Sequence, residues 1–370
     1  MLLRLRRDRP EPELESILAL CKELGYRARF LDERRELLQL EGDHDSPRPE
    51  HRSIFEDVAC VAAVLDRGDA RELHEAGPDR PETIVRVGDA AFGGGSIGLI
   101  AGPCAVEDDE HLFRIAHAVR AAGATVLRGG AYKPRTSPYS FQGKGHEGLR
   151  QLAEVKRETG LAIVTEVLDP REVEAVGDVA DMFQIGARSM ANTPLLTEVG
   201  RTQRPVLLKR GFGARVREFV LAAEYLLAQG ATQVVLCERG VRGFDSVTRN
   251  LLDVGAIAHL KQATHLPVIA DPSHAAGRAD LVRPLARSGL AAGADGLMIE
   301  VHLDPSEAHS DASQAISPAL FAQIASDAEA LAALDGRTLA RPSPQGDRVQ
   351  GAGPGRVPEP PAFPEPPVSV

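Results

Sequence analysis

The stretch DGLMIEVH, residues 295–302, decides the fold because it is the last of eight segments of the same kind. Each segment is a short apolar run with the length and composition of a buried strand, and each is followed by residues that suit a helix. The eight segments are SIGLIAG (96–102), ATVLRGG (124–130), LAIVTEV (161–167), DMFQIGA (181–187), PVLLKRG (205–211), QVVLCERG (233–240), PVIADPSH (267–274) and DGLMIEVH (295–302). The last helix is predicted to begin with Ser317 as its cap and Pro318 at its first position.

Eight strand–helix units predict an α/β fold of the (β/α)8 type, a TIM barrel, over residues 96–336. A doubly wound open sheet is the alternative for alternating strands and helices. The regular repetition of eight units favours the closed barrel.

Two further regions flank this barrel. Residues 1–69 show the order βαββαβ, which predicts a small ferredoxin-like α+β domain, and residues 70–95 are expected to be a linker that ends in AFGGGS. Residues 341–370 hold nine of the 26 prolines, so they are expected to be a disordered tail. A short peptide motif that binds a partner is the alternative for that tail.

Composition narrows the class of protein. The formal net charge of −10 argues against nucleic acid or an anionic membrane as the main partner, so any anionic ligand must meet a local cluster of cations. No apolar run has transmembrane length, and charged residues interrupt the start MLLRLRRDRPEPE before a signal-peptide core could form. The cysteines are scattered, which is typical of reduced thiols in a cytoplasmic protein: Cys21, Cys60, Cys104 and Cys237.

The carboxyl ends of the predicted strands carry the chemistry, because the active site of a TIM barrel lies at that face. Every end has a residue able to bind or react, in chain order Cys104, Arg128, Glu166, Arg188, Lys209, Arg239, His274 and Glu300. A barrel without a ligand would not be expected to carry such residues at every strand end.

One group of these residues predicts a metal site. Cys104, His274 and Glu300 follow the first, seventh and eighth strands, which are neighbours in a closed barrel, and Asp311 lies in the loop beyond. A thiolate, an imidazole and two carboxylates suit a divalent transition metal, namely Mn, Fe, Co or Zn. Taken singly, Cys104 could be a core residue, His274 a loop hydrogen-bonder and Asp311 a helix cap.

The second group is cationic and predicts a ligand with several negative charges, such as two phosphates. Buried cations without acidic partners are costly, so they are expected where an anion completes them. Each could alternatively form a surface salt bridge. The members are Arg128, Lys133, Arg135, Arg188, Lys209 and Arg239.

The motifs LIAGPC, LRGGAYKPRTSPYSFQG, QIGARSM, LLKRG, CERG, DPSH and IEVH, in this order, resemble the 3-deoxy-D-arabino-heptulosonate 7-phosphate (DAHP) synthase family, in its short bacterial form with an N-terminal ferredoxin-like domain. The resemblance implies a metal-dependent transferase that condenses phosphoenolpyruvate with erythrose 4-phosphate and water. This is the first step of the shikimate pathway, which leads to chorismate and the aromatic amino acids.

The resemblance also implies residue roles. Arg135 and Thr136 would hold erythrose 4-phosphate, Glu166 would position the attacking water, and Lys133 would assist proton transfer. The residues expected to hold phosphoenolpyruvate are Arg128, Lys133, Arg188, Lys209 and Arg239, and the catalytic residues are Lys133 and the metal ligands Cys104 and His274.

Two other functions stay open at this point. A 3-deoxy-manno-octulosonate 8-phosphate synthase would use arabinose 5-phosphate, but its loop resembles Asn-Arg-Ser-Ser where this chain has KPRTS at residues 133–137. A non-catalytic sensor of metabolites would be expected to lose metal ligands or cations.

In family members of this layout, the N-terminal domain resembles one that confers feedback inhibition by tyrosine or phenylalanine. It is therefore expected to bind an aromatic effector, or otherwise only to support contacts in a dimer or tetramer. A chain that begins near Gly93 is expected to stay active.

Overall fold

The computed structural model describes residues 2–6, 9–30, 35–41, 49–65, 73–77, 80–134, 137, 139–308 and 311–343. Its amino-terminal part contains one four-stranded sheet and two helices, α1 (Glu11–Glu23) and α2 (Pro49–Glu56). The sheet has the order β2-β3-β1-β4, and each described pair is antiparallel. Its strands are β1 (Leu2–Leu5), β2 (Arg27–Phe30), β3 (Leu37–Glu41) and β4 (Val61–Leu65).

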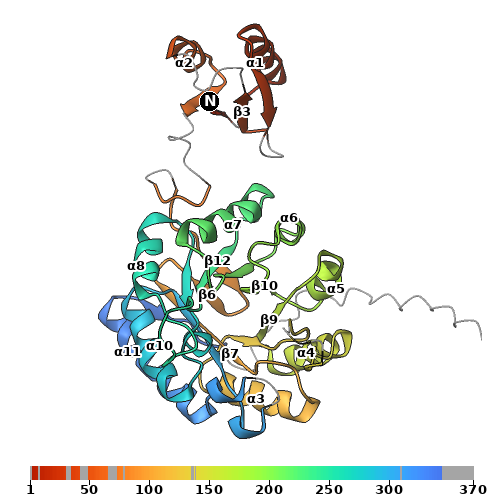
Figure 1. Ribbon diagram of the computed structural model, residues 1–370, viewed down its shortest axis with the longest axis vertical. Coiled ribbons are helices and arrows are strands. Elements are labelled where there is room, and N and C mark those ends of the chain that lie inside the picture. Colours follow the sequence, from red (N-terminus) through yellow and green to blue (C-terminus); the bar gives the residue numbers. More distant parts are fainter. Residues whose placement is uncertain are drawn as a thin grey trace, which may run out of the picture.

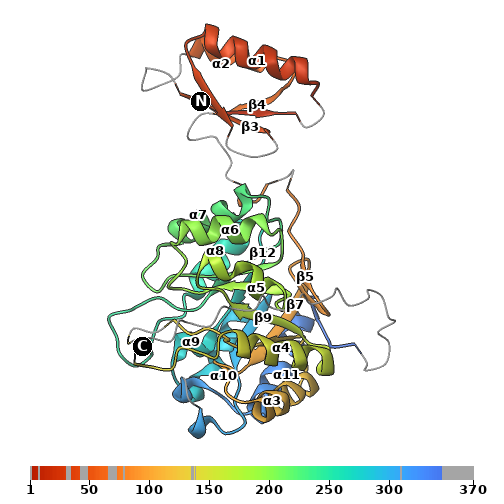
Figure 2. The same cartoon turned by 90° about the vertical axis from the view of Figure 1, so that its right-hand side faces the viewer.

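This order of elements confirms the predicted ferredoxin-like fold. Both helices cover the same face of the sheet (Figure 2), where Leu3, Ile17, Leu38 and Phe55 form a fully buried core. Along β2, exposed and half-buried positions alternate, and the exposed ones, Arg27 and Arg29, make the other face of the sheet polar there. The boundary at residue 69 stays a prediction, because residues 66–72 lie outside the described part of the chain.

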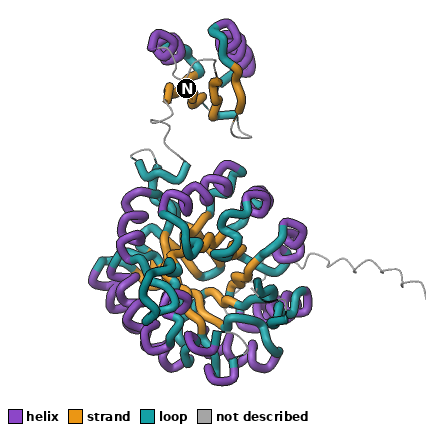
Figure 3. Tube along the Cα trace, viewed as in Figure 1, coloured by secondary structure: helices purple, strands orange, loops and turns teal. Residues whose placement is uncertain are grey.

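Eight parallel strands close into a barrel. The last strand pairs with the first from Gly296 opposite Gly98 to Glu300 opposite Gly102, which confirms the TIM barrel and excludes the open sheet. The strands form an inner ring with the helices outside it (Figures 1 and 3). The barrel strands are β7 (Ser96–Gly102), β8 (Val126–Arg128), β9 (Ala162–Glu166), β10 (Met182–Ile185), β11 (Val206–Lys209), β12 (Val234–Glu238), β13 (Val268–Ala270) and β14 (Gly296–Glu300).

The helices pack their apolar faces against the outer face of these strands, and the largest hydrophobic core lies between the two layers. The longest of them starts as predicted, since the Ser317 hydroxyl accepts a hydrogen bond from the backbone of Leu320 and Pro318 stands at the first position. The helices are α3 (Asp109–Ala121), α4 (His146–Thr159), α5 (Val173–Gly177), α6 (Thr193–Arg201), α7 (Val216–Ala228), α8 (Val254–Ala263), α9 (Pro272–Ala276), α10 (Ala279–Ala291) and α11 (Pro318–Leu334), with short 3-10 turns η1 (Pro170–Glu172), η2 (Pro305–Glu307) and η3 (Ala312–Gln314).

Residues 70–95, which were expected to be a linker, contain an antiparallel hairpin of β5 (Val85–Val87) and β6 (Ala90–Phe92). Its buried side chains pack against the residues that fill the barrel interior, such as Ile100 and Met298. The Phe92 ring lies so close to Gly98, near the start of β7, that a Cβ there would be 2.3 Å from a ring carbon. The hairpin therefore plugs the amino-terminal end of the barrel, where apolar side chains would otherwise meet water.

At the carboxyl end of the chain, β15 (Thr338–Leu339) pairs with β7. Ser343 then donates two hydrogen bonds to the Asp89 carboxylate, so the first residues of the predicted tail contact the plug hairpin's turn. Residues 344–370, predicted to be disordered, lie outside the described residues. All four cysteines are buried, without a disulfide between them. Among the described residues, no helix is both long and apolar enough to cross a membrane.

Candidate active site

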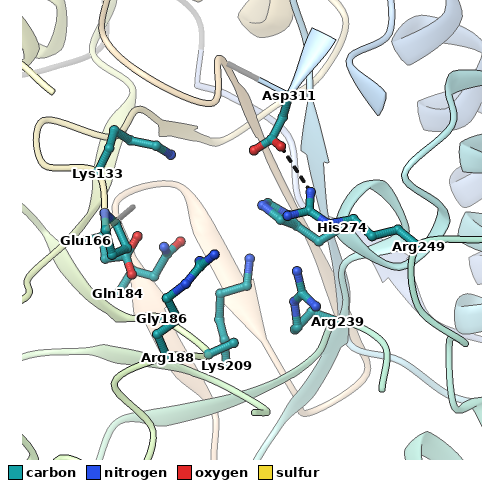
Figure 4. Close-up of a pocket in the computed structure, with 12 residues that line it drawn as sticks. Lys133, Glu166, Gln184, Gly186, Arg188, Lys209, Arg239, Arg249, His274 and Asp311 are labelled. Carbon is teal, nitrogen blue, oxygen red and sulfur yellow. Dashed lines mark hydrogen bonds and ion pairs between the residues drawn. The ribbon is translucent and has the colours of Figure 1, made fainter. Parts of the chain in front are cut away.

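The carboxyl ends of the barrel strands surround a polar pocket, as Figure 4 shows. Seven of the predicted residues line it: Lys133, Glu166, Arg188, Lys209, Arg239, His274 and Asp311. Cys104 and Glu300 are buried and contact residues of its wall, and the buried Arg128 pairs with Glu300. Arg135 and Thr136, predicted to hold the aldose phosphate, lie outside the described residues.

The four predicted metal ligands come together. Ligand atoms of Cys104, Glu300 and Asp311 all lie within 4.8 Å of one another. The Cys104 thiol donates to Asp311 Oδ2 at 3.2 Å, and His274 Nε2 lies 3.3 Å from Glu300 Oε1. The topology explains this, because β7, β13 and β14 are adjacent in the closed barrel.

The donor set fits a divalent transition metal. Burial raises the pKa of the Cys104 thiol to about 11, which a bound cation would reverse, and burial lowers the pKa of His274 to about 4, so the imidazole is neutral, as a ligand must be. Although burial opposes ionisation, Arg128 helps to keep the pKa of Glu300 below its ordinary value. Glu300 Oε1 is buried and accepts no hydrogen bond from the described residues, although Arg128 Nη2 lies 3.0 Å away as an ion-pair partner, so this oxygen can still accept a metal cation.

Asp271 was not predicted, although it holds the site together. It precedes Pro272 and caps α9, accepting a hydrogen bond from the His274 backbone at 3.0 Å. Its other oxygen accepts from His274 Nδ1 at 2.7 Å and from Lys209. The carboxylate thereby turns His274 Nε2 toward Glu300. The sequence signal was an Asp directly before Pro at a helix start, which identifies a cap but not its second contact.

The cations fall into two classes. Lys209 pairs with Asp271, and Arg128 Nη2 lies 3.0 Å from Glu300 Oε1, so the expectation that the cations have no acidic partners is wrong for these two. In the described part of the chain, no carboxylate lies within ion-pair distance of the other three, Lys133, Arg188 and Arg239. Arg128 also keeps two buried donors, Nε and Nη1, without partners. These unpaired donors are what an anionic ligand would satisfy.

The loop after β8 places Lys133 against Cys104, one of the predicted metal ligands. Lys133 Nζ donates to the carbonyl and the sulfur of Cys104 at 2.9 and 3.0 Å, and its backbone N donates to Gln142. Gly143 closes the loop at φ +92°, where a Cβ would lie 2.2 Å from the Ala131 carbonyl oxygen. The loop is therefore a fixed part of the pocket wall as far as Pro134.

Glu166 and Gln184 lie on the same side of the pocket as Lys133, and Arg249 lies on the other side beside His274 (Figure 4); neither Gln184 nor Arg249 was predicted. Glu166 and Gln184 are register partners on β9 and β10. A Cβ at Gly186 would lie 1.8 Å from Glu166 Oε1, so only glycine leaves room for this carboxylate. Gln184 was missed because it lies inside a predicted strand rather than at its end.

The sequence and the structure are similar to those of known proteins. The model of the DAHP synthetase I family matches residues 80–334. The phospho-2-dehydro-3-deoxyheptonate aldolase of Thermotoga maritima is 44% identical over 283 residues, which cover 75% of this chain and 82% of that protein. The 2-dehydro-3-deoxyphosphooctonate aldolase of Koribacter versatilis is 34% identical over 251 residues, 62% of this chain and 89% of that protein.

Two solved structures from Thermotoga maritima share the fold. The crystal structure of its DAHP synthase has a TM-score of 0.72 and 38% identity, and the match covers 91% of this chain and 98% of that one. A truncated form of the 3-deoxy-D-arabino-heptulosonate 7-phosphate synthase has a TM-score of 0.67 and 41% identity, with 72% of this chain and 98% of that chain covered. With a family model that matches most of the chain, a pocket of the expected composition and these relatives, the chain belongs to the DAHP synthetase I family.

Proposed function

We infer that this chain is a DAHP synthase, which condenses phosphoenolpyruvate with erythrose 4-phosphate and water and releases inorganic phosphate. One observation of the structure carries the inference: a donor set for a transition metal shares a pocket with cations that lack carboxylate partners. Such a pocket suits two anionic substrates held next to a Lewis acid.

The cations bind and orient phosphoenolpyruvate. Arg188, Lys209 and Arg239 point into the pocket in Figure 4, and with Arg128 and Lys133 they can neutralise its phosphate and carboxylate. Arg135 and Thr136 hold the phosphate of erythrose 4-phosphate, as the resemblance implies. Holding two mutually repelling anions at contact distance is a large part of the catalytic task.

Carbon 3 of phosphoenolpyruvate attacks the aldehyde carbon, and water adds at carbon 2 before phosphate leaves with cleavage of its C–O bond. Lys133 gives a proton to the oxygen of the former aldehyde, and Glu166, on the same side of the pocket (Figure 4), orients the water. Cys104, His274, Glu300 and Asp311 would hold a divalent metal, which would supply Lewis acidity to polarise the aldehyde. A lysine imine at Lys209 is not required, because a metal would activate the aldehyde instead. The ion pair of this amine with Asp271 also disfavours its use as a nucleophile.

The KPRTS segment, residues 133–137, supports erythrose 4-phosphate over arabinose 5-phosphate, and the octulosonate synthase from Koribacter versatilis is a more distant relative than the heptulosonate enzyme. The decisive experiment incubates the purified chain with phosphoenolpyruvate and either aldose phosphate and measures phosphate release. We expect turnover with erythrose 4-phosphate only.

Metal dependence is tested in the same assay. A chelator should abolish turnover, and Mn, Fe, Co or Zn should restore it. Cys104→Ser should bind metal far more weakly, because a neutral hydroxyl replaces a thiolate. Full activity of the metal-free chain would refute the site.

The N-terminal ferredoxin-like unit is a regulatory domain that binds an aromatic amino acid and inhibits the barrel of a homo-oligomer. Every residue assigned to chemistry lies between Cys104 and Asp311, outside this unit. A truncated chain should start at residue 73 rather than near Gly93, because the later start deletes the plug hairpin. We expect this chain to stay active and to lose its response to tyrosine and phenylalanine. If the activity of the full chain does not respond to aromatic amino acids, chorismate or prephenate, the regulatory role is wrong and support of oligomer contacts remains as the role of this unit. Light scattering would then show a smaller oligomer for the truncated chain.

A further inference from the structure

Arg249, on the loop between β12 and α8, joins the pocket wall to one of the metal ligands. Its Nη1 donates to Asp311 Oδ1 at 3.0 Å, the contact drawn as a dashed line in Figure 4. The same nitrogen donates to Gln314 Oε1, also at 3.0 Å. Neither this arginine nor Gln314 is among the residues proposed to bind the two substrates.

Gln314 extends the contact to a second ligand. Its amide is 1% exposed, and because Oε1 accepts from Arg249, its Nε2 faces Glu300 and donates to Oε2 at 2.6 Å. In both carboxylates the second oxygen then faces the donor set: Asp311 Oδ2 lies 3.2 Å from the Cys104 sulfur and Glu300 Oε1 lies 3.3 Å from His274. Arg249 thus holds each carboxylate on the side away from the metal.

Asp311 needs such support because its backbone is in an unfavourable region. It is a non-glycine residue in the left-handed conformation, with φ at 56°. Among the described residues, its carboxylate has two hydrogen-bond partners, the thiol of Cys104 and the guanidinium of Arg249. Without the arginine, only the hydrogen bond from the Cys104 thiol would hold the rotamer that points Oδ2 toward the sulfur.

The loop that carries Arg249 is itself anchored to the helix of a third ligand. The Arg249 and Asn250 backbone nitrogens donate to Ala276 and Ala275 of α9, and Asn250 Nδ2 donates to the His274 carbonyl at 3.0 Å. A Cβ at Gly277 would lie 2.5 Å from the Arg249 Cβ, so the two segments pack without a gap. One loop therefore contacts the supports of three of the four ligands.

We propose that Arg249 is a positioning residue of the metal site, which holds Asp311 directly and Glu300 through Gln314 in the orientation that binds the metal. This inference rests on the metal site of the proposed function. Arginine suits the role because one planar guanidinium can donate to a carboxylate and an amide at once, whereas a lysine ammonium has a single mobile head.

The experiment measures metal affinity rather than turnover. The full chain is stripped with a chelator and titrated with Co²⁺, and the thiolate-to-cobalt charge-transfer absorption reports binding at Cys104. Outer contacts to metal ligands typically change affinity by about 10- to 100-fold, so we expect Arg249→Ala to bind Co²⁺ more weakly by that factor. Arg249→Lys, which keeps the charge beside Asp311 but loses Gln314, should fall between Arg249→Ala and the native chain.

Arg242→Ala is the matched control. Arg242 lies on the same loop, is exposed and stacks on the Phe212 ring at 4.4 Å, so its removal changes the loop charge equally. Its Co²⁺ affinity should stay within about twofold of the native value, since a lone surface charge is largely screened. Circular dichroism of each metal-free variant establishes that it is folded.

Gln314→Ala keeps the test decisive if Arg249→Ala does not fold, since it removes only the link to Glu300 and should also weaken Co²⁺. In the combined variant, the effect of Gln314→Ala should shrink, because the amide is no longer oriented. Equal affinities of the native chain, Arg249→Ala and Gln314→Ala would overturn the inference alone. A native chain that binds no Co²⁺ would overturn the metal site of the proposed function, and the inference with it.

Discussion

Replacing Asp271 with asparagine separates two tasks that this one carboxylate performs. Asp271 is fully buried, and although burial opposes ionisation, His274 and Lys209 keep its pKa well below the ordinary value, so it is charged at neutral pH. It pairs with Lys209, whose side chain is 4% exposed, and it accepts from His274 Nδ1 at 2.7 Å. Asparagine keeps the shape and caps a helix equally well, so α9 should still begin at Pro272.

The first consequence concerns stability. In Asp271→Asn, the buried Lys209 has lost its counter-charge, and breaking one partner of a buried ion pair costs about 3–5 kcal/mol. Chemical denaturation of the metal-free chain at neutral pH should show a loss of this size in the free energy of unfolding. Adding Lys209→Met removes the unpaired charge and should recover most of that loss.

The second consequence concerns the metal. A carboxamide holds the imidazole less firmly than a carboxylate, so Co²⁺ affinity should fall by about 10- to 100-fold, and Lys209→Met should not restore it. Two results would refute the reasoning. If Asp271→Asn with Lys209→Met is as unstable as Asp271→Asn alone, the unpaired charge is not the cause; if Co²⁺ affinity is unchanged, Asp271 does not orient His274.

Three further outcomes are expected. Gly98→Ala should destabilise the barrel by about 1–3 kcal/mol, because the new Cβ would lie 2.3 Å from the Phe92 ring. The same substitution should cost much less in a Phe92→Ala background, which thermal unfolding of the native chain, the two single variants and the double variant would show. Burial raises the pKa of both the Cys21 and the Cys237 thiols to about 12, so at pH 9 a thiol reagent should label these two residues in the native chain no faster than the chain unfolds. Rapid labelling of either residue, identified by peptide mass analysis, would contradict their burial. Arg135→Ala removes one charge-assisted hydrogen bond of about 1.5–3 kcal/mol, so the Michaelis constant for erythrose 4-phosphate should rise by about 10- to 150-fold while that for phosphoenolpyruvate changes little. Equal changes in both constants would contradict the assignment of Arg135 to erythrose 4-phosphate and of the other cations to phosphoenolpyruvate.

The barrel could be predicted from the sequence because its signal is local. A strand buried on both faces is an apolar run, and the residue that follows it must reach the carboxyl face of the barrel. That logic alone located Cys104, His274 and Glu300, since it needs only the order of the strands. The neighbouring strands β13, β14 and β7 then bring these side chains together.

The plug hairpin could not be predicted in the same way, because its glycines resemble those of a flexible linker. In the structure they make tight turns: Gly93 has φ at 88°, and a Cβ there would lie 2.4 Å from the Thr83 carbonyl oxygen. A glycine selected for a positive φ and one selected for flexibility look alike in a single sequence. Only the packing of Phe92 against the barrel floor distinguishes the two.

Asp271 and Arg249 were missed for a different reason: the strand order brings segments together but does not specify which side chains in them form a contact. Asp271 reads as a helix cap, and its contact with Lys209 spans 62 residues of sequence. Arg249 lies within a long loop of an otherwise ordinary composition, and its contact with Asp311 likewise spans 62 residues. Such pairings depend on side-chain geometry, which neither composition nor periodicity encodes.

The distribution of charge explains why an acidic chain can bind two anions at one pocket. Two of the proposed ligands and the carboxylate that orients His274 are already paired with cations: Glu300 with Arg128, Asp311 with Arg249 and Asp271 with Lys209. A bound divalent cation would therefore add positive charge to a site whose carboxylates are partly neutralised, while Lys133, Arg188 and Arg239 face the same space. Metal and anion must then favour each other, since each lowers the electrostatic cost of the other, and by thermodynamic linkage the coupling has the same size in both directions. Loss of an orienting contact at Asp271 or Arg249 should therefore weaken metal and anion together, since a misplaced ligand lowers metal affinity and with it the contribution of the metal to anion binding.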